Sequence, residues 1–297
     1  MKSKTISLDA RLSDTDRRLI TTAARSHAFE RTATRSGLVP IGYGAQKLRL
    51  AYTSRLDELD RGLRVAATEA ERWQVRLDTF FDPVPVMPLY KKAGIVPPPA
   101  IRNLSMRNQF YLVRVAGRFA AAGGMRVASL RYTLRFSGTG PAAGRQPVVH
   151  AFFPGIGTRR YGGADVLVGL RSTLQFWVAV TPGGAVIETA DKIPGSVRSD
   201  LVFGPVKYQF GKTHVDGSGA GRPSVEWFYP GEAVAGGAKV WNLLVLRLPE
   251  GSSSCHVAAA IEANVTMPAS LQPLLGKYRL LRDTRHLELR MPGAGRD

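Results

Sequence analysis

The sequence predicts a mainly β protein, a sandwich or barrel, preceded by an α-helical N-terminal region. Two observations predict this fold. Apolar residues recur every three or four positions before residue 83, whereas they alternate at every second position after about residue 105. The chain also contains 31 glycines and 19 prolines, and many of them form turn sequences between short apolar segments. Because no helical pattern separates these segments, eight to ten strands of a sandwich or barrel are expected.

Residues 1–82 form the predicted helical and basic N-terminal region. Ser13-Asp14-Thr15-Asp16 resembles a capping box that starts a first helix. A second helix is predicted from Ser54, because apolar residues recur at helical steps until Asp82-Pro83 ends it. Its apolar positions are Leu56, Leu59, Leu63, Ala66, Ala70, Trp73, Leu77 and Phe80. Residues 83–104 follow as a connector, with six prolines in residues 83–100.

Residues 105–268 form the predicted β region, and its clearest strand begins near residue 125. In that strand Leu130, Tyr132, Leu134 and Phe136 alternate with Ser129, Arg131, Thr133 and Arg135. The first set is expected to be buried and the second to lie on a polar face. The preceding strand places Arg114 and Arg118 on one face in the same way. Residues 269–297 are predicted to be a C-terminal extension.

The positive charge of the chain points to a polyanionic partner. The net charge is +18. Residues 1–50 carry ten Lys and Arg against four acids, and residues 101–150 carry eight arginines and no acid. Clustering of this kind favours nucleic acid or an anionic membrane over a soluble protein that merely has a basic pI.

The predicted nucleic-acid-binding residues come from these two basic regions. They are Lys2, Lys4, Arg11, Arg17, Arg18, Arg25, Arg31, Arg35, Arg114, Arg118, Arg131 and Arg135. The four arginines of the β region have no acid nearby in the sequence. They are therefore expected to meet an anion, or acids of a neighbouring chain such as Asp57, Glu58 or Asp60, or to be solvated with their stems packed over the sheet.

The sequence gives no indication of an enzyme, a cofactor or a metal site. No histidine stands at a metal-ligand spacing from another, and the adjacent Cys255 and His256 point to opposite faces of a strand. As the single cysteine, Cys255 suits a reducing compartment. The N-terminus lacks the apolar core of a signal peptide, and no apolar run reaches the about 20 residues of a membrane helix. Aromatic residues such as Trp227 are predicted to be core, not a platform for stacking bases.

The order of the β segments resembles the eight-stranded jelly-roll coat proteins of small icosahedral positive-strand RNA viruses, the picorna-like group especially. The segments that carry the resemblance are SLRYTLRFSGTG at residues 129–140, VVHAFFPG at 148–155, LRSTLQFWVAV at 170–180 and SVEWFYPG at 224–231. Two closing strands, joined by PEGSSS, complete the pattern. The resemblance implies an eight-stranded jelly roll over residues 105–268.

The resemblance implies a capsid protein that assembles into an icosahedral shell and packages nucleic acid. Its partners would be copies of itself or related coat subunits, and RNA bound without sequence specificity. It would reside in the virion after assembly in the host cytoplasm, with no membrane span. The alternative function is a cellular nucleic-acid- or glycan-binding β-sandwich module without catalytic activity.

Overall fold

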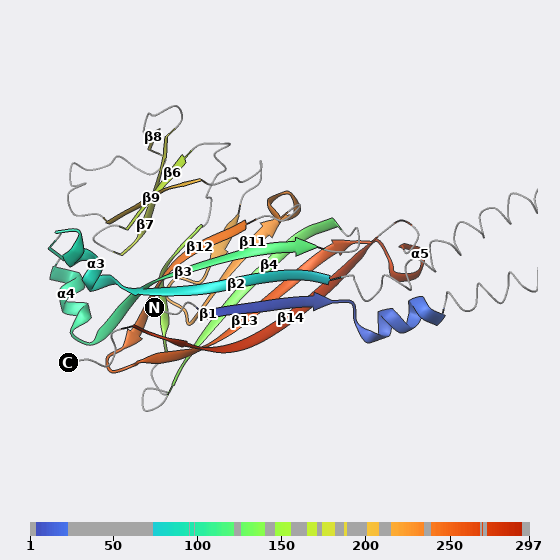
Figure 1. Cartoon of the computed structure of the whole chain (residues 1–297), viewed down its shortest axis with the longest axis horizontal. Coiled ribbons are helices and arrows are strands. Elements are labelled where there is room, and N and C mark those ends of the chain that lie inside the picture. The colour runs from blue at the N-terminus through green and yellow to red at the C-terminus, as the bar shows by residue number, and fades with distance from the viewer. Residues whose placement is uncertain are drawn as a thin grey trace, which may run out of the picture.

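One long, twisted antiparallel sheet forms the body of the protein in the computed structural model (Figure 1). The structure describes residues 4–22, 74–94, 96–97, 99–121, 126–139, 146–155, 165–170, 174–181, 187–188, 201–207, 215–234, 239–267, 269 and 272–292. The ten strands of the sheet are β1 (Lys4–Arg11), β2 (Gln74–Pro85), β3 (Asn108–Ala121), β4 (Arg126–Gly138), β5 (Val148–Phe153), β10 (Asp216–Ser218), β11 (Ser224–Pro230), β12 (Lys239–Pro249), β13 (Ser254–Thr266) and β14 (Tyr278–Arg290).

The large sheet consists of two halves of five strands that meet at β1 and β14. Its order is β10-β11-β4-β13-β14-β1-β2-β3-β12-β5. We call β1, β2, β3, β12 and β5 the first half, and β14, β13, β4, β11 and β10 the second half. β1 and β14 share a single register pair, Arg11 with Arg282. Outside that pair, two hydrogen bonds between a side chain and the backbone join the strands. Asp283 Oδ2 accepts the Asp9 N–H at 2.6 Å, and the Lys4 ammonium donates to the Glu288 carbonyl.

The opposite edges of the sheet also meet, so that the sheet is nearly closed. The Val149 N–H in β5 donates to the Arg222 carbonyl at 2.8 Å, and the Gly221 N–H donates to the Val149 carbonyl at 2.8 Å. Residues 221 and 222 lie in the turn between β10 and β11. The Trp227 indole N–H donates to the Pro154 carbonyl at 3.2 Å and adds a side-chain link at this edge.

The inner faces of the two halves pack against each other and form the main core. Alternate residues point inward, as the period of a strand requires. From the first half they include Leu8, Leu77 and Phe81, and from the second half Tyr132 and Trp227, all fully buried. The rings of Tyr132 and Trp227 stack at a centroid distance of 5.9 Å.

Two buried hydrogen bonds connect the halves inside this core. The Tyr229 hydroxyl of the second half donates to Asn242 Oδ1 of the first half at 2.7 Å. The Tyr132 hydroxyl lies 3.4 Å from Thr79 Oγ1, which in turn donates to the Ala116 carbonyl at 3.1 Å. Burial raises the pKa of both tyrosines far above its usual value, so their hydroxyls stay protonated.

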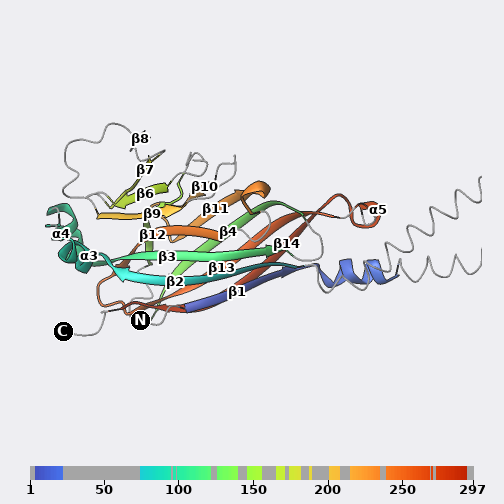
Figure 2. The same cartoon turned by 45° about the horizontal axis from the view of Figure 1, so that its top comes forward.

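A second layer covers the outer face of the first half at one end. It contains the helices α3 (Val86–Lys92) and α4 (Pro99–Ser105) and a small sheet of order β8-β7-β6-β9 (Figure 2). The strands of the small sheet are β6 (Asp165–Leu170), β7 (Phe176–Thr181), β8 (Ile187–Glu188) and β9 (Leu201–Lys207). Beneath this layer Phe110, Leu112, Leu243 and Val245 form a second apolar cluster.

Short helical elements lie elsewhere in the described residues. Residues 14–22 are helical. A 3-10 turn, η4 (Gly231–Val234), follows β11, and α5 (Gln272–Leu275) precedes β14. The capping prediction for the first helix is confirmed, because the Asp16 N–H donates to Ser13 Oγ at 3.1 Å.

The prediction of a mainly β protein is confirmed, but an eight-stranded jelly roll is not the observed architecture. A jelly roll divides eight strands between two sheets, whereas this chain has one ten-stranded sheet and a small second one. The predicted helix that ends at Asp82 is wrong over residues 74–82, which belong to β2. Leu77 and Phe80 are three residues apart and fit one face of a helix, but pairing with β1 and β3 makes the segment a strand, in which Leu77 is buried and Phe80 lies on the opposite face. The earlier residues of that helix, 54–73, lie outside the described ones.

Candidate functional site

Helices α3 and α4 lie together at one end of the molecule (Figures 1 and 2). Val86 and Tyr90 anchor α3, because both side chains are fully buried in the second apolar cluster. The helix ends where the Ala93 N–H donates to the Leu89 carbonyl at 2.9 Å. Gly94 follows in the left-handed conformation, with φ 67°, which glycine adopts without strain.

The helix α4 is anchored in the same way and turns its other side outward. Pro99 begins it, at a position where a missing N–H costs nothing. Ile101 is buried in the second cluster, whereas Arg102 and Leu104 are exposed. The chain then turns through Met106 and enters β3.

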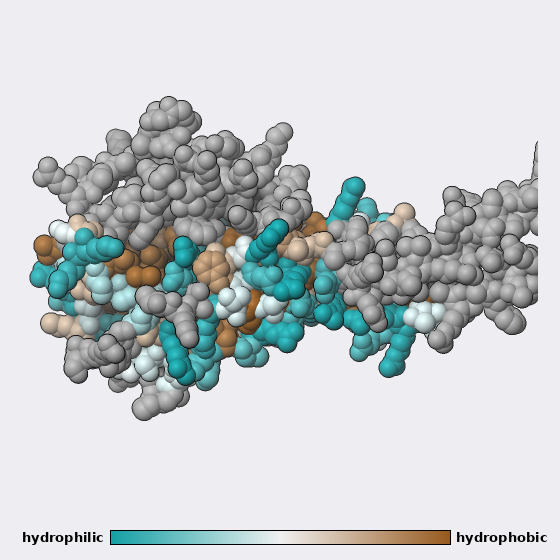
Figure 3. All heavy atoms as spheres, in the orientation of Figure 1, coloured by the Kyte–Doolittle hydropathy of each residue, from teal (hydrophilic) through white to brown (hydrophobic). Residues whose placement is uncertain are grey.

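Large apolar side chains are exposed at this end to an unusual degree. Val96 is 74% exposed, Met106 is 72% exposed and Leu104 is 40% exposed. Single exposed apolar residues are common on soluble proteins, whereas three within residues 96–106 make this segment a candidate interaction surface. Figure 3 shows apolar and hydrophilic atoms side by side at the end of the molecule that carries α3 and α4.

Four exposed cations lie on the same two helices and the turn that follows them: Lys91, Lys92, Arg102 and Arg107. None of the four forms an ion pair with the described part of the chain. Residues 83–164 contain no Asp or Glu, so an acidic partner would have to come from another segment of the chain, as it does for Arg114 and Arg131. Glu250 lies next to Arg107 in the structure, because its backbone N–H donates to the Arg107 carbonyl at 3.2 Å. We call Lys91, Lys92, Val96, Arg102, Leu104, Met106 and Arg107 the tip surface.

The predicted arginines of β3 have acidic partners in the same chain. Arg114 donates to Asp82 Oδ2 at 2.9 Å, and its guanidinium lies 5.3 Å from the centre of the Phe80 ring. Arg118 stands opposite Asp78 in the register of β2 and β3. Burial pushes the pKa of Asp78 up, but the hydrogen bond from Arg76 and the charges of Arg76 and Arg118 hold it below its usual range.

The predicted arginines of β4 differ from each other. Arg131 lies between two acids, with Nε 3.3 Å from Glu226 Oε1 and Nη1 3.4 Å from Glu262 Oε2. Glu262 also meets Arg282, at 2.9 Å. Arg135 forms no ion pair with the described residues. The expectation that Arg114 and Arg131 lack an acid within their own chain is therefore wrong, because the acids come from strands far away in the sequence.

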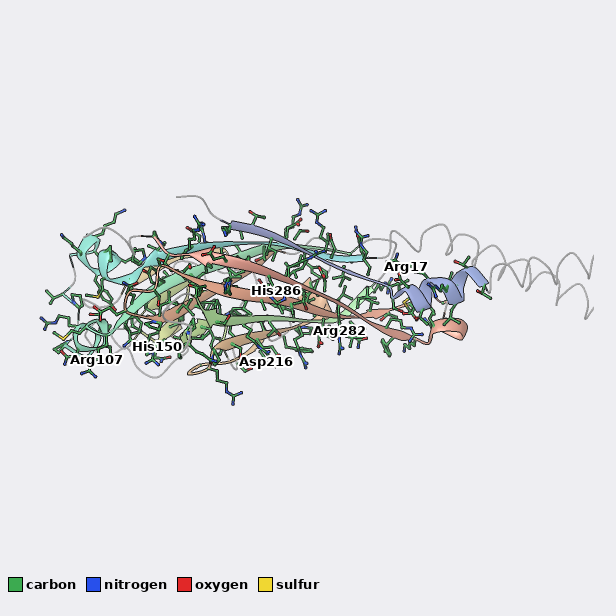
Figure 4. The ribbon with its side chains drawn as sticks, turned by 90° about the horizontal axis from the view of Figure 1, so that it is seen from below. Arg17, Arg107, His150, Asp216, Arg282 and His286 are labelled. Atoms are coloured by element: carbon green, nitrogen blue, oxygen red, sulfur yellow. The ribbon has the colours of Figure 1, made fainter. Side chains whose placement is uncertain are left out.

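The predicted N-terminal residues are spread over separate elements. Lys4 bonds to β14, Arg11 is exposed at the end of β1, and Arg17 lies 3.9 Å from Asp14 in the first helix. Arg18 is exposed on the same helix. Figure 4 shows Arg17 at the opposite end of the molecule from Arg107 of the tip surface. Lys2, Arg25, Arg31 and Arg35 lie outside the described residues.

The described residues hold no group of three or more His, Cys, Asp or Glu that would bind a metal ion. Burial, and to a lesser extent the charge of Glu288, raises the pKa of the Cys255 thiol to about 12. The thiol is therefore protonated at neutral pH. Within the same described ranges, no helix is long and apolar enough to cross a bilayer. Trp227 and Tyr229 are core residues as predicted, whereas Phe228 is 37% exposed.

The fold defines a mainly β protein with a nearly closed ten-stranded antiparallel sheet. No protein-family model and no curated protein matches the sequence. Solved structures that resemble the fold include Clostridium perfringens delta-toxin, with a TM-score of 0.35 and 8% identity over 73% of this chain and 84% of the toxin. The Clostridium perfringens NetB toxin in its membrane-inserted form gives a TM-score of 0.27 and 8% identity over 73% of this chain and 89% of that one. A third structure, titled a pore-forming protein, gives a TM-score of 0.27 and 8% identity over 73% of this chain and 84% of that one.

The predicted capsid function is wrong. The solved structures named above are two toxins and a pore-forming protein, and none of them is a viral capsid protein. The predictions of a virion component, of packaged RNA and of assembly in a host cytoplasm depend on the capsid function and are wrong as well. The alternative of a cellular nucleic-acid- or glycan-binding module gains no support from the structure either.

The tip surface was not among the predicted sites, although the sequence carries a signal for it. The prolines of residues 83–104 predict a connector. The same residues combine Lys91, Lys92 and Arg102 with aliphatic side chains and contain no acid. The sequence alone does not show which of these side chains are exposed, because that depends on which of them the second apolar cluster buries.

Proposed function

We propose that the protein binds anionic membrane surfaces through its tip surface, as a binding protein and not as an enzyme. The observation that carries the proposal is the mixture, at one end of the molecule, of exposed aliphatic side chains and cations that have no acidic partner among the described residues. Cations attract the anionic headgroups, and the aliphatic side chains enter the boundary between headgroups and acyl chains.

The expected energies are large enough to hold the protein at a membrane. Each Lys or Arg close to an anionic surface contributes about 1 kcal/mol. Burial of an aliphatic side chain contributes about 1.5–3 kcal/mol when it is complete. The four cations therefore supply long-range attraction, and Val96, Leu104 and Met106 add a contribution that salt does not screen.

The exposed side chains favour a membrane over nucleic acid as the partner. Single-stranded nucleic acid is bound on exposed aromatic rings that stack on bases. The exposed apolar residues of the tip surface are aliphatic, and Tyr90, the aromatic residue of α3, is fully buried. Apolar side chains between phosphates would lose hydration without gaining a stacking partner.

Co-sedimentation with vesicles tests the proposal. The full chain is mixed with vesicles of phosphatidylcholine alone or with about one third phosphatidylserine. We expect binding to the anionic vesicles, and a loss of roughly 30-fold for Lys91→Gln/Lys92→Gln and again for Arg102→Gln/Arg107→Gln. Met106→Ser weakens binding at high salt as well, because its contribution is not electrostatic.

A matched control removes the same charge from the other end of the molecule. Arg18 and Arg126 are exposed and lie near α5, far from α3 and α4. Arg18→Gln/Arg126→Gln is expected to change vesicle binding less than about twofold. Equal losses for the control and the tip variants would show a response to net charge alone and would overturn the proposal. A tip variant that loses binding to single-stranded RNA but keeps vesicle binding would replace the membrane by nucleic acid.

A further inference from the structure

The outer face of the second half carries a second set of exposed apolar residues. Phe228 is 37% exposed in β11, and Tyr278 and Leu280 are 51% and 50% exposed in β14. The described elements leave this face uncovered, unlike the outer face of the first half. Figure 4 shows Arg282 and His286 projecting from this part of the molecule.

The register places the residues of this face in rows across four strands. The order across each row is β14, β13, β4 and β11. One row contains Leu280, Asn264, Ser129 and Pro230, and the next contains Arg282, Glu262, Arg131 and Phe228. A third row contains Thr284, Ala260, Thr133 and Glu226. We call these three rows the ladder face.

We infer that the ladder face binds the ladder face of a second copy of this chain. A two-fold axis parallel to the strands, midway between β4 and β13, places β4 of one copy over β13 of the other. Each row of one copy then faces the same row of the other copy, with the order of the four strands reversed. Such an interface is self-complementary only if the first residue of a row suits the last, and the second suits the third.

The middle row satisfies this condition through its charges. Glu262 meets Arg131 of the second copy, and the reverse contact forms at the same time. Arg282 meets the ring of Phe228 of the second copy, which is a favourable cation–π arrangement. Arg131 is 49% exposed and Glu262 is 32% exposed beyond their contacts within the chain, so both have surface left for a second partner.

The flanking rows contain apolar and polar pairs, and their one charged residue, Glu226, faces the neutral Thr284 of the second copy. Leu280 meets Pro230 of the second copy, which removes apolar surface of both from water. Ala260 meets Thr133 of the second copy, and these small side chains let the sheets approach to about 10 Å. None of the facing pairs in the three rows joins two charges of the same sign.

The size of the face sets the strength of the interaction. Four strands about 4.8 Å apart, each with the three outward residues that belong to the three rows, give a footprint of roughly 400 Å² per copy. Stable complexes bury about 800 Å² on each partner. The dimer is therefore weak and reversible, and it forms at high local concentration.

Sedimentation of the full chain from about 1 µM to about 200 µM measures the association. We expect a monomer that becomes a dimer with rising concentration. Arg131→Glu and Glu262→Arg each place like charges across the axis twice and weaken the dimer at least about tenfold. Leu280→Ser weakens it without a change of charge, and it is harmless to folding because the side chain is half exposed.

A mixture of the two single variants separates contacts between copies from effects within one copy. In the mixture each introduced carboxylate faces an introduced guanidinium, and each native glutamate faces a native arginine. We therefore expect Arg131→Glu and Glu262→Arg to form a mixed dimer although neither dimerises alone. Arg114→Glu, a matched reversal in the ion pair of the first half, leaves the association unchanged.

Any of three results would overturn the inference. The first is a wild-type chain that stays monomeric over the whole concentration range. The second is a wild-type dimer that Leu280→Ser and Arg131→Glu leave intact, and the third is two folded single variants that do not associate when mixed. Circular dichroism melts of each variant establish that it is folded before the comparison is made.

Discussion

The outer faces of the two halves of the sheet differ although their inner faces follow the same pattern. Along the strands of both halves, every second residue is apolar and points inward, and these residues together fill the main core. The outer face of the first half is apolar at one end, where Phe110 and Val245 lie under the second layer. The outer face of the second half is crossed by ion pairs between Arg282, Glu262 and Arg131. The alternation thus fixes what lies inside, whereas the chemistry of the outer face depends on what covers it.

A matched pair of leucine substitutions measures the energetic difference between the outer faces. Leu243, on the outer face of β12, is 3% exposed, and Leu280, on the outer face of β14, is 50% exposed. Leu243→Ala leaves a cavity under the second layer and is expected to cost about 2–5 kcal/mol of unfolding free energy. Leu280→Ala is expected to cost less than about 0.5 kcal/mol at concentrations where the chain is monomeric. Urea denaturation measures both, and similar losses would mean that the two faces are equally covered.

A second prediction concerns the buried hydrogen bond that joins the halves. Tyr229→Phe removes the donor to Asn242 Oδ1 and leaves this fully buried amide unsatisfied, because Asn242 Nδ2 already has no hydrogen-bond partner among the described residues. The expected loss is about 1–3 kcal/mol in urea denaturation. Tyr278→Phe, a change of the same type at an exposed position, is the control and should be silent.

The combined variant sharpens this result. Tyr229→Phe/Asn242→Leu removes both polar partners and should be more stable than Tyr229→Phe alone, because no unpaired polar group remains in the core. A combined loss equal to the sum of the two single losses would show that the two side chains do not interact.

The inward pattern of the strands could be predicted from the sequence because it is local. Leu130, Tyr132, Leu134 and Phe136 were expected to share a buried face, and all four are buried in β4. A period of two along one strand is sufficient for this inference. The same reasoning correctly assigned Trp227 to the core.

The outward pattern could not be predicted, because it depends on pairing between distant segments. Arg131 is separated from Glu262 by 131 positions in the sequence, and only the register of β4 with β13 brings them together. Residues 74–82 were assigned to a helix because Leu77 and Phe80 continue a helical spacing. Their strand conformation follows from pairing with β1 on one side and β3 on the other. For the tip surface, the buried partners of Val86 and Tyr90 decide which neighbouring side chains are left exposed.

The smallest expected effect concerns an ion pair on the part of the first half that the second layer does not cover. Arg76 Nε lies 2.9 Å from Asp78 Oδ1, and the Asp78 side chain is 42% exposed. The pKa of Asp78 is lower in the folded chain than its usual value of about 3.9. A carboxyl group with a lowered pKa in the folded state stabilises that state fully above its unfolded pKa. This contribution is lost as the pH falls through the folded value.

Asp78→Asn should therefore reduce the free energy of unfolding slightly at pH 7, and the difference from the wild type should shrink as the pH falls below about 4. Solvent screening keeps the effect small, because the pair is nearly half exposed. Urea denaturation in steps between about pH 2.5 and pH 7 measures it. Asp216→Asn, which removes an exposed carboxylate that has no ion pair within the described residues, is the control. A difference between Asp78→Asn and the wild type that stays constant across this range would show that the pair does not stabilise the first half through its charge.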